Sequence, residues 1–315
     1  MHPLWFILVA LGIIALLSLI TSFICFMKVF YCKRRKEEKD GEVYIPKGKF
    51  YDPYREEILD WVRMTRGMKH EDLSITSEDG LTLRGRYYEY EAGAPLEILF
   101  HGYQGNAERD LSGGVDRCFR LGRNALIIDQ RACGTSDGHV TTFGIMESRD
   151  CLLWINKAIE RFGEDVKIIL TGVSMGAATV MIASGEKLPE NVIYTLADCG
   201  YTSAKEIIKK VILEMRLPAN LLYPFVRLGA LIFGRFNLEA TSPKEAIARA
   251  TVPVIFIHGD EDDFVPCEMS KELYEICPTT KKLTLIPGSG HGVAFPCNKE
   301  MYLNALKEFY AECGF

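Results

Sequence analysis

The chain has 315 residues, of which 25% are charged, and its formal net charge is −5 at pH 7. This length is sufficient for one large α/β domain and an appendage. The acidic balance argues against a nucleic-acid partner, because proteins that bind nucleic acids present a basic stripe to the phosphates. The sequence shows no internal repeat and no low-complexity tract.

The N-terminal segment is strongly apolar, and residues 4–27 contain no charged side chain. As a helix this run would be about 36 Å long, which is enough to cross a bilayer with some tilt. A cleaved signal peptide is the alternative. It fits poorly, because no basic segment precedes the run, the run is too long, and no small-residue cleavage site ends it. We predict that residues 1–30 form a single transmembrane anchor.

Basic side chains follow the apolar run at Lys28, Lys33, Arg34, Arg35 and Lys36. The positive-inside rule then predicts a single-pass protein of the cell membrane with its larger part in the cytoplasm. The ten cysteines include no C-x-x-C pair, so the sequence indicates neither a zinc site nor a disulfide framework. Free thiols are easier to maintain in a reducing compartment, which agrees with this orientation.

Residues 31–70 are predicted to form a juxtamembrane linker and a helix. The stretch 33–49 is charged and contains Gly41, Pro46 and Gly48, and residues 51–68 have apolar side chains at helical spacing. We assign residues 71–315 to the catalytic domain.

The catalytic domain begins with two strand-like runs, 73–76 and 81–90, around the hairpin signal Asp79-Gly80. Apolar runs then alternate with helical patterns. They predict buried strands at 96–100, 125–129, 166–170, 192–196, 252–257 and 283–286, and helices near 115–121, 145–162 and 302–310. This alternation predicts an α/β fold with a mostly parallel central sheet and helices on both faces.

A long insertion with a helical pattern occupies residues 204–236. Its apolar side chains exceed what one buried face needs, and Pro218 and Pro224 are expected to break it into pieces. We interpret residues 203–238 as a small helical cap over the site. An ordinary crossover helix with a second packed helix is the alternative.

The pentapeptide Gly172-Val173-Ser174-Met175-Gly176 lies between an apolar run and a small-residue helix. A G-x-S-x-G sequence in this context is typical of a nucleophile elbow, with glycines where strand and helix approach closely. Ser174 is the candidate nucleophile, and the backbone N–H of Met175 is a candidate oxyanion donor. Tyr103, in the glycine loop after residues 96–100, is the candidate second donor. The alternatives are a glycine-flanked serine at an ordinary turn and a loop that only reverses the chain.

A serine nucleophile needs a base and a group that orients this base. His291 follows the last predicted strand, and Asp262 follows the strand before it. The carboxyl ends of parallel strands share one edge of a sheet, so these loops are expected to meet Ser174. The rival acids are Asp198, Asp260 and Asp263, and Cys199 is a rival nucleophile. We expect His101 and His258 to support loops, and Asp129 and Arg131 to fix the turn that follows their strand.

Residues 73–315 resemble α/β-hydrolases of the serine esterase and serine aminopeptidase-like group, in particular their membrane-anchored members. The motifs that carry the resemblance are His101-Gly102-Tyr103, Asp129-x-Arg131 with Gly134 and Ser136, the elbow 172–176, Gly259-x-x-Asp262-x-x-Val265-Pro266, and Gly290-His291. In that family the acid is the aspartate three residues after the glycine, which selects Asp262. Ala132 departs from the glycine that many members carry, and we expect it to alter the loop slightly and leave the chemistry unchanged.

The resemblance implies a serine hydrolase that cleaves a carboxylic ester or a thioester through an acyl-enzyme, without a metal or organic cofactor. Its expected partners are a small-molecule or lipid-like acyl substrate and the membrane. Two other functions stay open at this point. The same residues serve a peptidase or amidase, and a catalytically idle hydrolase fold would serve as a membrane-tethered binding module.

Overall fold

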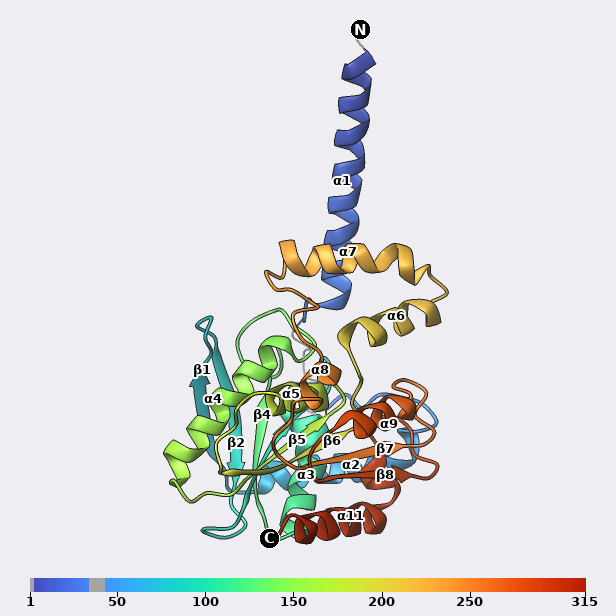
Figure 1. Ribbon diagram of the computed structural model, residues 1–315. Coiled ribbons are helices and arrows are strands. Elements are labelled where there is room, and N and C mark those ends of the chain that lie inside the picture. The colour runs from blue at the N-terminus through green and yellow to red at the C-terminus, as the bar shows by residue number, and fades with distance from the viewer. Residues whose placement is uncertain (1–2, 34–42) are drawn as a thin grey trace.

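The computed structural model describes residues 3–33 and 43–315. Its N-terminal helix α1 (Pro3–Val29) extends away from the globular body (Figure 1). Most of its large apolar side chains are exposed, and it is long and apolar enough to cross a membrane. The hydroxyls of Ser18, Thr21 and Ser22 bond carbonyls one turn earlier in the same helix, as an apolar surrounding requires. Lys28 lies in its last turn, whereas Arg34, Arg35 and Lys36 lie outside the described residues.

The body is built on an eight-stranded sheet in the order β1-β2-β4-β3-β5-β6-β7-β8. Strands β1 and β2 pair antiparallel, as do β2 and β4, and the five remaining pairs are parallel. The strands are β1 (Glu71–Thr76), β2 (Thr82–Tyr88), β3 (Leu96–Phe100), β4 (Asn124–Asp129), β5 (Ile168–Val173), β6 (Val192–Asp198), β7 (Val254–Gly259) and β8 (Lys281–Ile286). The predicted α/β class and mostly parallel sheet are confirmed.

Helices cover both faces of this sheet (Figure 1). One face packs against α4 (Ile145–Phe162), α5 (Met175–Ser184), α8 (Pro243–Ile247) and α9 (Cys267–Ile276). The other packs against α2 (Arg55–Gly67), α3 (Ala107–Arg120), α10 (Ala294–Cys297) and α11 (Lys299–Glu312). Adjacent residues of β3 point to opposite faces of the sheet. Ile98 packs in the core on the α4 side, and Leu99 packs in the core on the α3 side. Strands buried on both sides explain the near-continuous apolar runs in the sequence.

Between β6 and β7 the chain forms α6 (Ala204–Glu214) and α7 (Ala219–Ile232) before α8. The break between α6 and α7 ends at Pro218, as predicted. The second predicted break is wrong, because Pro224 lies inside α7. Pro224 is exposed, so its ring points away from the packed face of the helix, and only its own missing N–H is lost to the backbone ladder. The helix α7 also packs against the C-terminal end of α1, in one apolar cluster with Phe26 and Phe30.

The described part of the juxtamembrane segment lies against the body. Val43 and Ile45 are buried with Leu59 and Val62 of α2, after which a short 3₁₀ turn, Asp52–Tyr54, leads into that helix. Further along, a Cβ on Gly290 would lie 2.2 Å from the ring of Phe50, so this ring occupies the space that a side chain would fill. This segment therefore approaches the loop that carries His291.

Candidate functional site

Ser174 sits in a strained turn between β5 and α5. Its backbone has φ 57° and ψ −114°, in the region that non-glycine residues rarely adopt. A Cβ on Gly172 would lie 2.0 Å from the carbonyl oxygen of Gly176, and a Cβ on Gly176 would lie 2.0 Å from that of Phe100. Both glycines are therefore required by the close approach of helix and strands. The strained turn holds the Ser174 side chain above the carboxyl end of the sheet.

Three candidate side chains from separate loops form a continuous chain of hydrogen bonds. His291 Nε2 lies 2.8 Å from Ser174 Oγ, and His291 Nδ1 lies 2.7 Å from Asp262 Oδ2. A carboxylate oxygen can only accept, so Nδ1 carries the proton and Nε2 accepts from the serine hydroxyl. The imidazole is thus held in the tautomer in which Nε2 is free to take a proton from Ser174. The ring of Phe264 packs edge-on against it at 5.0 Å.

Asp262 accepts hydrogen bonds at both of its oxygens. Oδ1 accepts from the backbone N–H groups of Phe264 (3.0 Å) and Val265 (2.8 Å). Oδ2 accepts from His291 and also from Nε2 of the buried His258, at 3.1 Å. Burial of the carboxyl group acts to raise its pKa, but the bonds from the two histidines and from the Val265 N–H outweigh this, so the pKa of Asp262 lies well below its usual value. The Asp262 side chain is therefore a carboxylate throughout the ordinary pH range.

The sequence analysis placed His258 only as a support of its loop and missed its direct bond to the candidate acid. Its Nδ1 lies 2.6 Å from Ser270 Oγ, and its Nε2 also donates to the carbonyl of Val265 at 2.8 Å. The spacing of four residues between His258 and Asp262 across a tight turn is the only local signal for this contact.

Two backbone N–H groups lie beside Ser174 without a hydrogen-bond partner among the residues that the structure describes. One belongs to Met175, the first residue of α5, and the other to Tyr103 in the loop after β3. A Cβ on Gly102 would lie 3.6 Å from that of Ser174, which shows how closely this loop approaches the serine. Free N–H groups in such a position form the arrangement that stabilises a developing oxyanion.

The loop after β3 is fixed by His101. Its Nε2 accepts from the backbone N–H of Gln130 at 3.1 Å, and its Nδ1 donates to the carbonyl of Gly102 at 2.7 Å. The side chain of Gln130 returns a bond to the His101 carbonyl at 2.6 Å and accepts one from Thr179 of α5 at 3.0 Å. With both ring nitrogens engaged, His101 supports the loop and has no nitrogen left for the site.

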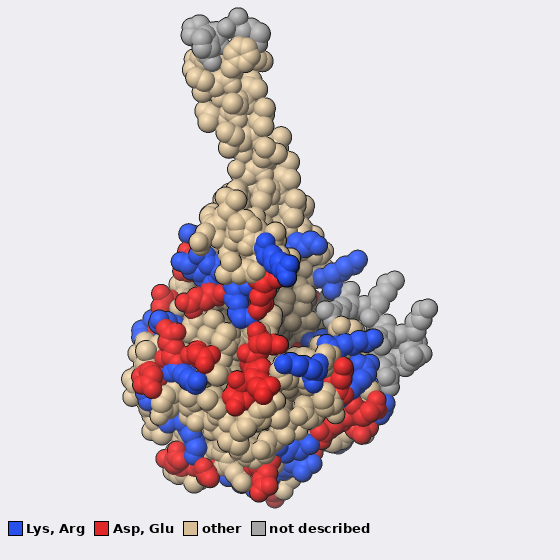
Figure 2. Space-filling view, turned by 90° about the vertical axis from the view of Figure 1, so that its right-hand side faces the viewer, with Lys and Arg blue, Asp and Glu red and all other residues tan. Residues whose placement is uncertain are grey.

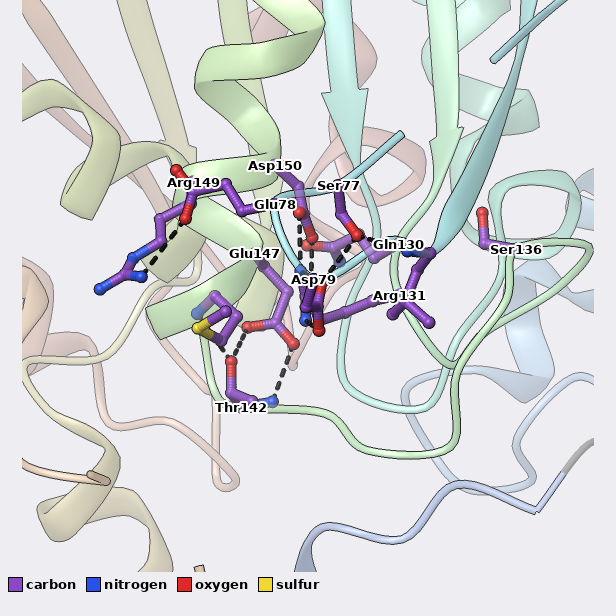
Figure 3. Close-up of polar contacts among 12 residues, drawn as sticks. Ser77, Glu78, Asp79, Gln130, Arg131, Ser136, Thr142, Glu147, Arg149 and Asp150 are labelled. Atoms are coloured by element: carbon purple, nitrogen blue, oxygen red, sulfur yellow. Dashed lines mark hydrogen bonds and ion pairs between the residues drawn. The ribbon is translucent and has the colours of Figure 1, made fainter. Parts of the chain in front are cut away.

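Polar contacts also fix the turn after β4, as Figure 3 shows. Arg131 makes a two-pronged ion pair with Asp150 of α4, at 2.7 and 2.8 Å, and a further pair with Asp79 at 3.1 Å. At the start of α4, Glu147 accepts from the backbone and hydroxyl of Thr142. The expected structural role of Arg131 follows from these buried contacts, which brace the turn against the helix.

A cavity of about 270 Å³ opens beside Ser174 and His291. Its wall is largely apolar and comes from α2, α3, α10 and the juxtamembrane segment; Ile45, Tyr51, Trp61, Tyr103, Phe264 and Phe295 line it. The packing of α2 on α3 is tight at this wall, since a Cβ on Gly113 would lie 2.6 Å from the Trp61 ring. An apolar cavity with a few polar groups at one end is the usual form of a small-molecule site.

Comparisons with known proteins agree with this geometry. Residues 171–301 match the model of the FSH1 serine hydrolase family. The YqkD protein of Bacillus subtilis is 27% identical over 236 residues, which cover 75% of this chain and 77% of YqkD. The Pyrococcus furiosus esterase Pf2001 superposes with a TM-score of 0.63 and 22% identity, over 86% of this chain and 98% of the esterase. The chain has the α/β-hydrolase fold.

A further relative of the chain is the membrane protein YNL320W of Saccharomyces cerevisiae. It is 22% identical over 254 residues, which cover 80% of this chain and 83% of the yeast protein. The family match includes the elbow and both loops that carry Asp262 and His291.

The rival candidate residues occupy different environments. Cys199 is fully buried, and this burial raises its pKa well above the ordinary value, so its thiol is a poor nucleophile. Its sulfur lies within 4.8 Å of ligand atoms of Asp262 and His291, a spacing that a metal ion could bridge. Both ring nitrogens of His291 are already hydrogen-bonded, however, so this trio lacks a free imidazole ligand.

Asp198 is among the residues that line the cavity, and no hydrogen bond joins its side chain to His291. Its Oδ2 accepts from the hydroxyl of Tyr302 at 2.7 Å, and its Oδ1 has no partner among the described residues. Burial raises the pKa of this carboxyl group. Of the other rivals, Asp260 accepts from the backbone N–H of Gly288 at 2.7 Å, a bond that joins the loop after β7 to the loop after β8.

Proposed function

We propose that this α/β-hydrolase is a membrane-anchored serine hydrolase that cleaves carboxylic esters through an acyl-enzyme. The observation that carries the proposal is the hydrogen-bonded chain from Ser174 through His291 to Asp262, set beside two free backbone N–H groups. A module that only binds ligands has no need of this arrangement. The apolar cavity next to the serine suits the acyl part of an ester.

In the proposed mechanism Ser174 Oγ attacks the carbonyl carbon of the ester while His291 Nε2 takes the hydroxyl proton. Asp262 holds the imidazole in place and stabilises the imidazolium that forms. The N–H groups of Tyr103 and Met175 donate to the oxyanion. His291 then gives its proton to the leaving alcohol, which departs and leaves the acyl group on Ser174.

In the second half of the reaction His291 removes a proton from a water molecule, which attacks the acyl-enzyme. The carboxylic acid is released, and Ser174 regains its proton from His291. Each proton that the imidazole accepts is thus returned, and the residues end in their starting states. A thioester follows the same steps with a thiol as leaving group.

A paired assay on the purified full chain tests the proposal. We expect a fluorophosphonate to label Ser174, and p-nitrophenyl esters to be hydrolysed faster than aminoacyl anilides. Absence of labelling in folded protein would favour the idle binding module. Faster cleavage of the anilides would show that the protein is an amidase or peptidase and not an esterase.

A further inference from the structure

Helix α7 is apolar on two opposite faces. One face is buried against α6 and α1 through Ala219, Tyr223, Val226 and Ala230. The other presents Leu221, Leu231 and Ile232, whose side chains are 63%, 59% and 45% exposed. Arg227 is the only charged residue of the helix. A helix that is apolar on nearly all sides is stable in water only when it is covered, or else it lies at a membrane.

The connection from α6 to α7 continues this surface. Leu213, Met215 and Leu217 are exposed there by 61%, 64% and 41%. We call the six side chains the outer cap face: Leu213, Met215, Leu217, Leu221, Leu231 and Ile232. Single exposed apolar residues are ordinary, but several on adjoining segments mark a surface that is covered in the working protein.

The position of α7 along α1 indicates what covers this face. A Cβ on Gly229 would lie 2.5 Å from the carbonyl oxygen of Ser22, and the ring of Phe233 contacts that of Phe23 at 5.1 Å. From Leu4 to Ser22 a helix rises by roughly 27 Å, close to the 30 Å thickness of a bilayer core. The two helices therefore cross at the level where α1 leaves the hydrocarbon.

Figure 1 shows α7 lying across α1, with the body on the side away from the free end of α1. The side of α7 that is opposite its packed residues carries Leu221, Leu231 and Ile232 of the outer cap face. These three side chains are thus turned towards the layer that α1 would span. A bilayer spanned by α1 would meet them without any change in the fold.

Acidic and basic side chains lie at this level, and Glu214 and Glu239 are paired with Lys205, Lys210 and Arg227. Lys28, Arg216 and Arg235 are exposed, and none of them has an ion-pair partner within residues 3–33 and 43–315. Figure 2 shows lysine and arginine side chains around the place where the apolar column joins the body. Basic side chains next to a membrane interact favourably with anionic headgroups, at about 1 kcal/mol each.

We infer that the outer cap face lies in the interface between headgroups and acyl chains of the membrane that α1 spans. The chain is then held by two elements, a spanning helix and an interfacial helix, and the body has one fixed orientation. The oxyanion loop would face the bilayer, because the hydroxyl of Tyr103 donates to the carbonyl of Val29 at 2.8 Å. Acyl substrates dissolved in the membrane would then reach the site from its surface.

Depth-dependent fluorescence quenching of the full chain in vesicles tests this inference. In a Trp5→Phe background, Leu221→Trp and Leu231→Trp place a reporter on the outer cap face, and the emission of the remaining Trp61 and Trp154 is subtracted with the Trp5→Phe protein alone. Tyr90→Trp is the matched control, because Tyr90 is 48% exposed and bonds to Asn124 at the opposite edge of the sheet. Brominated phosphatidylcholine is expected to quench the two cap reporters by about twofold or more, since an interfacial helix buries its apolar face by ~5–10 Å.

Two results would overturn the inference. Quenching of the cap reporters no stronger than that of the Tyr90→Trp control would place the face in water. A blue shift that grows with the protein-to-lipid ratio, without quenching by bromine, would show that a second copy covers it. As an independent measurement, vesicles should slow amide hydrogen exchange in α7 of the parent but not in the Leu221→Asp/Leu231→Asp double variant. Neither readout depends on catalysis, so a failure here is separate from a failure of the proposed ester hydrolysis.

Discussion

The substitution Asp262→Asn keeps the size of the candidate acid and removes its charge. The amide oxygen must replace Oδ1, because two backbone N–H groups donate to that position. The new NH₂ group then faces the ring N–H groups of His291 and His258, which both donate to Oδ2 in the parent. Three donors and no acceptor meet there. His291 avoids the contact between two donors only if its proton moves from Nδ1 to Nε2. In that tautomer Nε2 is unable to accept the proton of Ser174.

We expect kcat to fall by about 10⁴, which corresponds to roughly 5 kcal/mol of transition-state stabilisation. The assay measures kcat and KM for a p-nitrophenyl ester with the purified full chain, beside thermal unfolding. Asp260→Asn is the matched control, because Asp260 bonds to the backbone N–H of Gly288, where an amide oxygen can also accept, and lies outside the hydrogen-bonded chain from Ser174. A kcat for Asp262→Asn within about tenfold of the parent would refute the tautomer argument, provided that the protein is folded.

Four other predictions follow from the contacts. Tyr103→Phe removes the hydrogen bond to the carbonyl of Val29 and keeps the backbone N–H of residue 103. It should lower the free energy of unfolding, measured in urea, by about 1 kcal/mol. It should lower kcat by far less than the ~10²-fold that the loss of an oxyanion donor causes. Arg131→Gln leaves Asp150 unpaired in the interior and should destabilise the fold by about 3–5 kcal/mol, against about 0–1 for the exposed Arg149→Gln. The folded protein lowers the pKa of Asp262, so the ionised carboxylate contributes to stability. This contribution is complete above pH ~4 and is lost as the pH falls towards the lowered pKa. The unfolding free energies of the parent and of Asp262→Asn should therefore converge on acidification. A C-terminal reporter active only in the cytoplasm should give signal and one active only outside should give none, because the basic residues follow the anchor.

The strands and helices of the body were predictable because their signals are local. The helix predicted at 145–162 agrees with α4, which begins after Gly144 and ends before Gly163, both at positive φ. The strands were predicted from their apolar runs and differ from the observed ones by a few residues at their ends, because the ends are set by backbone pairing and not by the apolar run. Pro224 shows the limit of a local rule, because a proline is found inside a helix here, with its side chain on the exposed side.

The contacts that join Ser174, His291 and Asp262 were predictable from topology, because the loops that follow parallel strands all lie at one edge of the sheet. Contacts that join distant segments without a repeating pattern were not. The bond from His258 to Asp262, the bond from Tyr103 to Val29, and the placement of Ile45 in the cavity wall depend on tertiary packing. The catalytic roles and the domain boundaries 1–30, 31–70 and 71–315 stay predictions.

The most direct measurement of the central proposal is the intact mass of the full chain after reaction with a fluorophosphonate, followed by mapping of the modified peptide. The account predicts one adduct, on Ser174, that is absent from Ser174→Ala and forms far more slowly in His291→Ala. Both variants should keep the thermal unfolding transition of the parent. An adduct on Cys199 or another residue, or labelling of Ser174 that is unaffected by His291→Ala, would contradict the account.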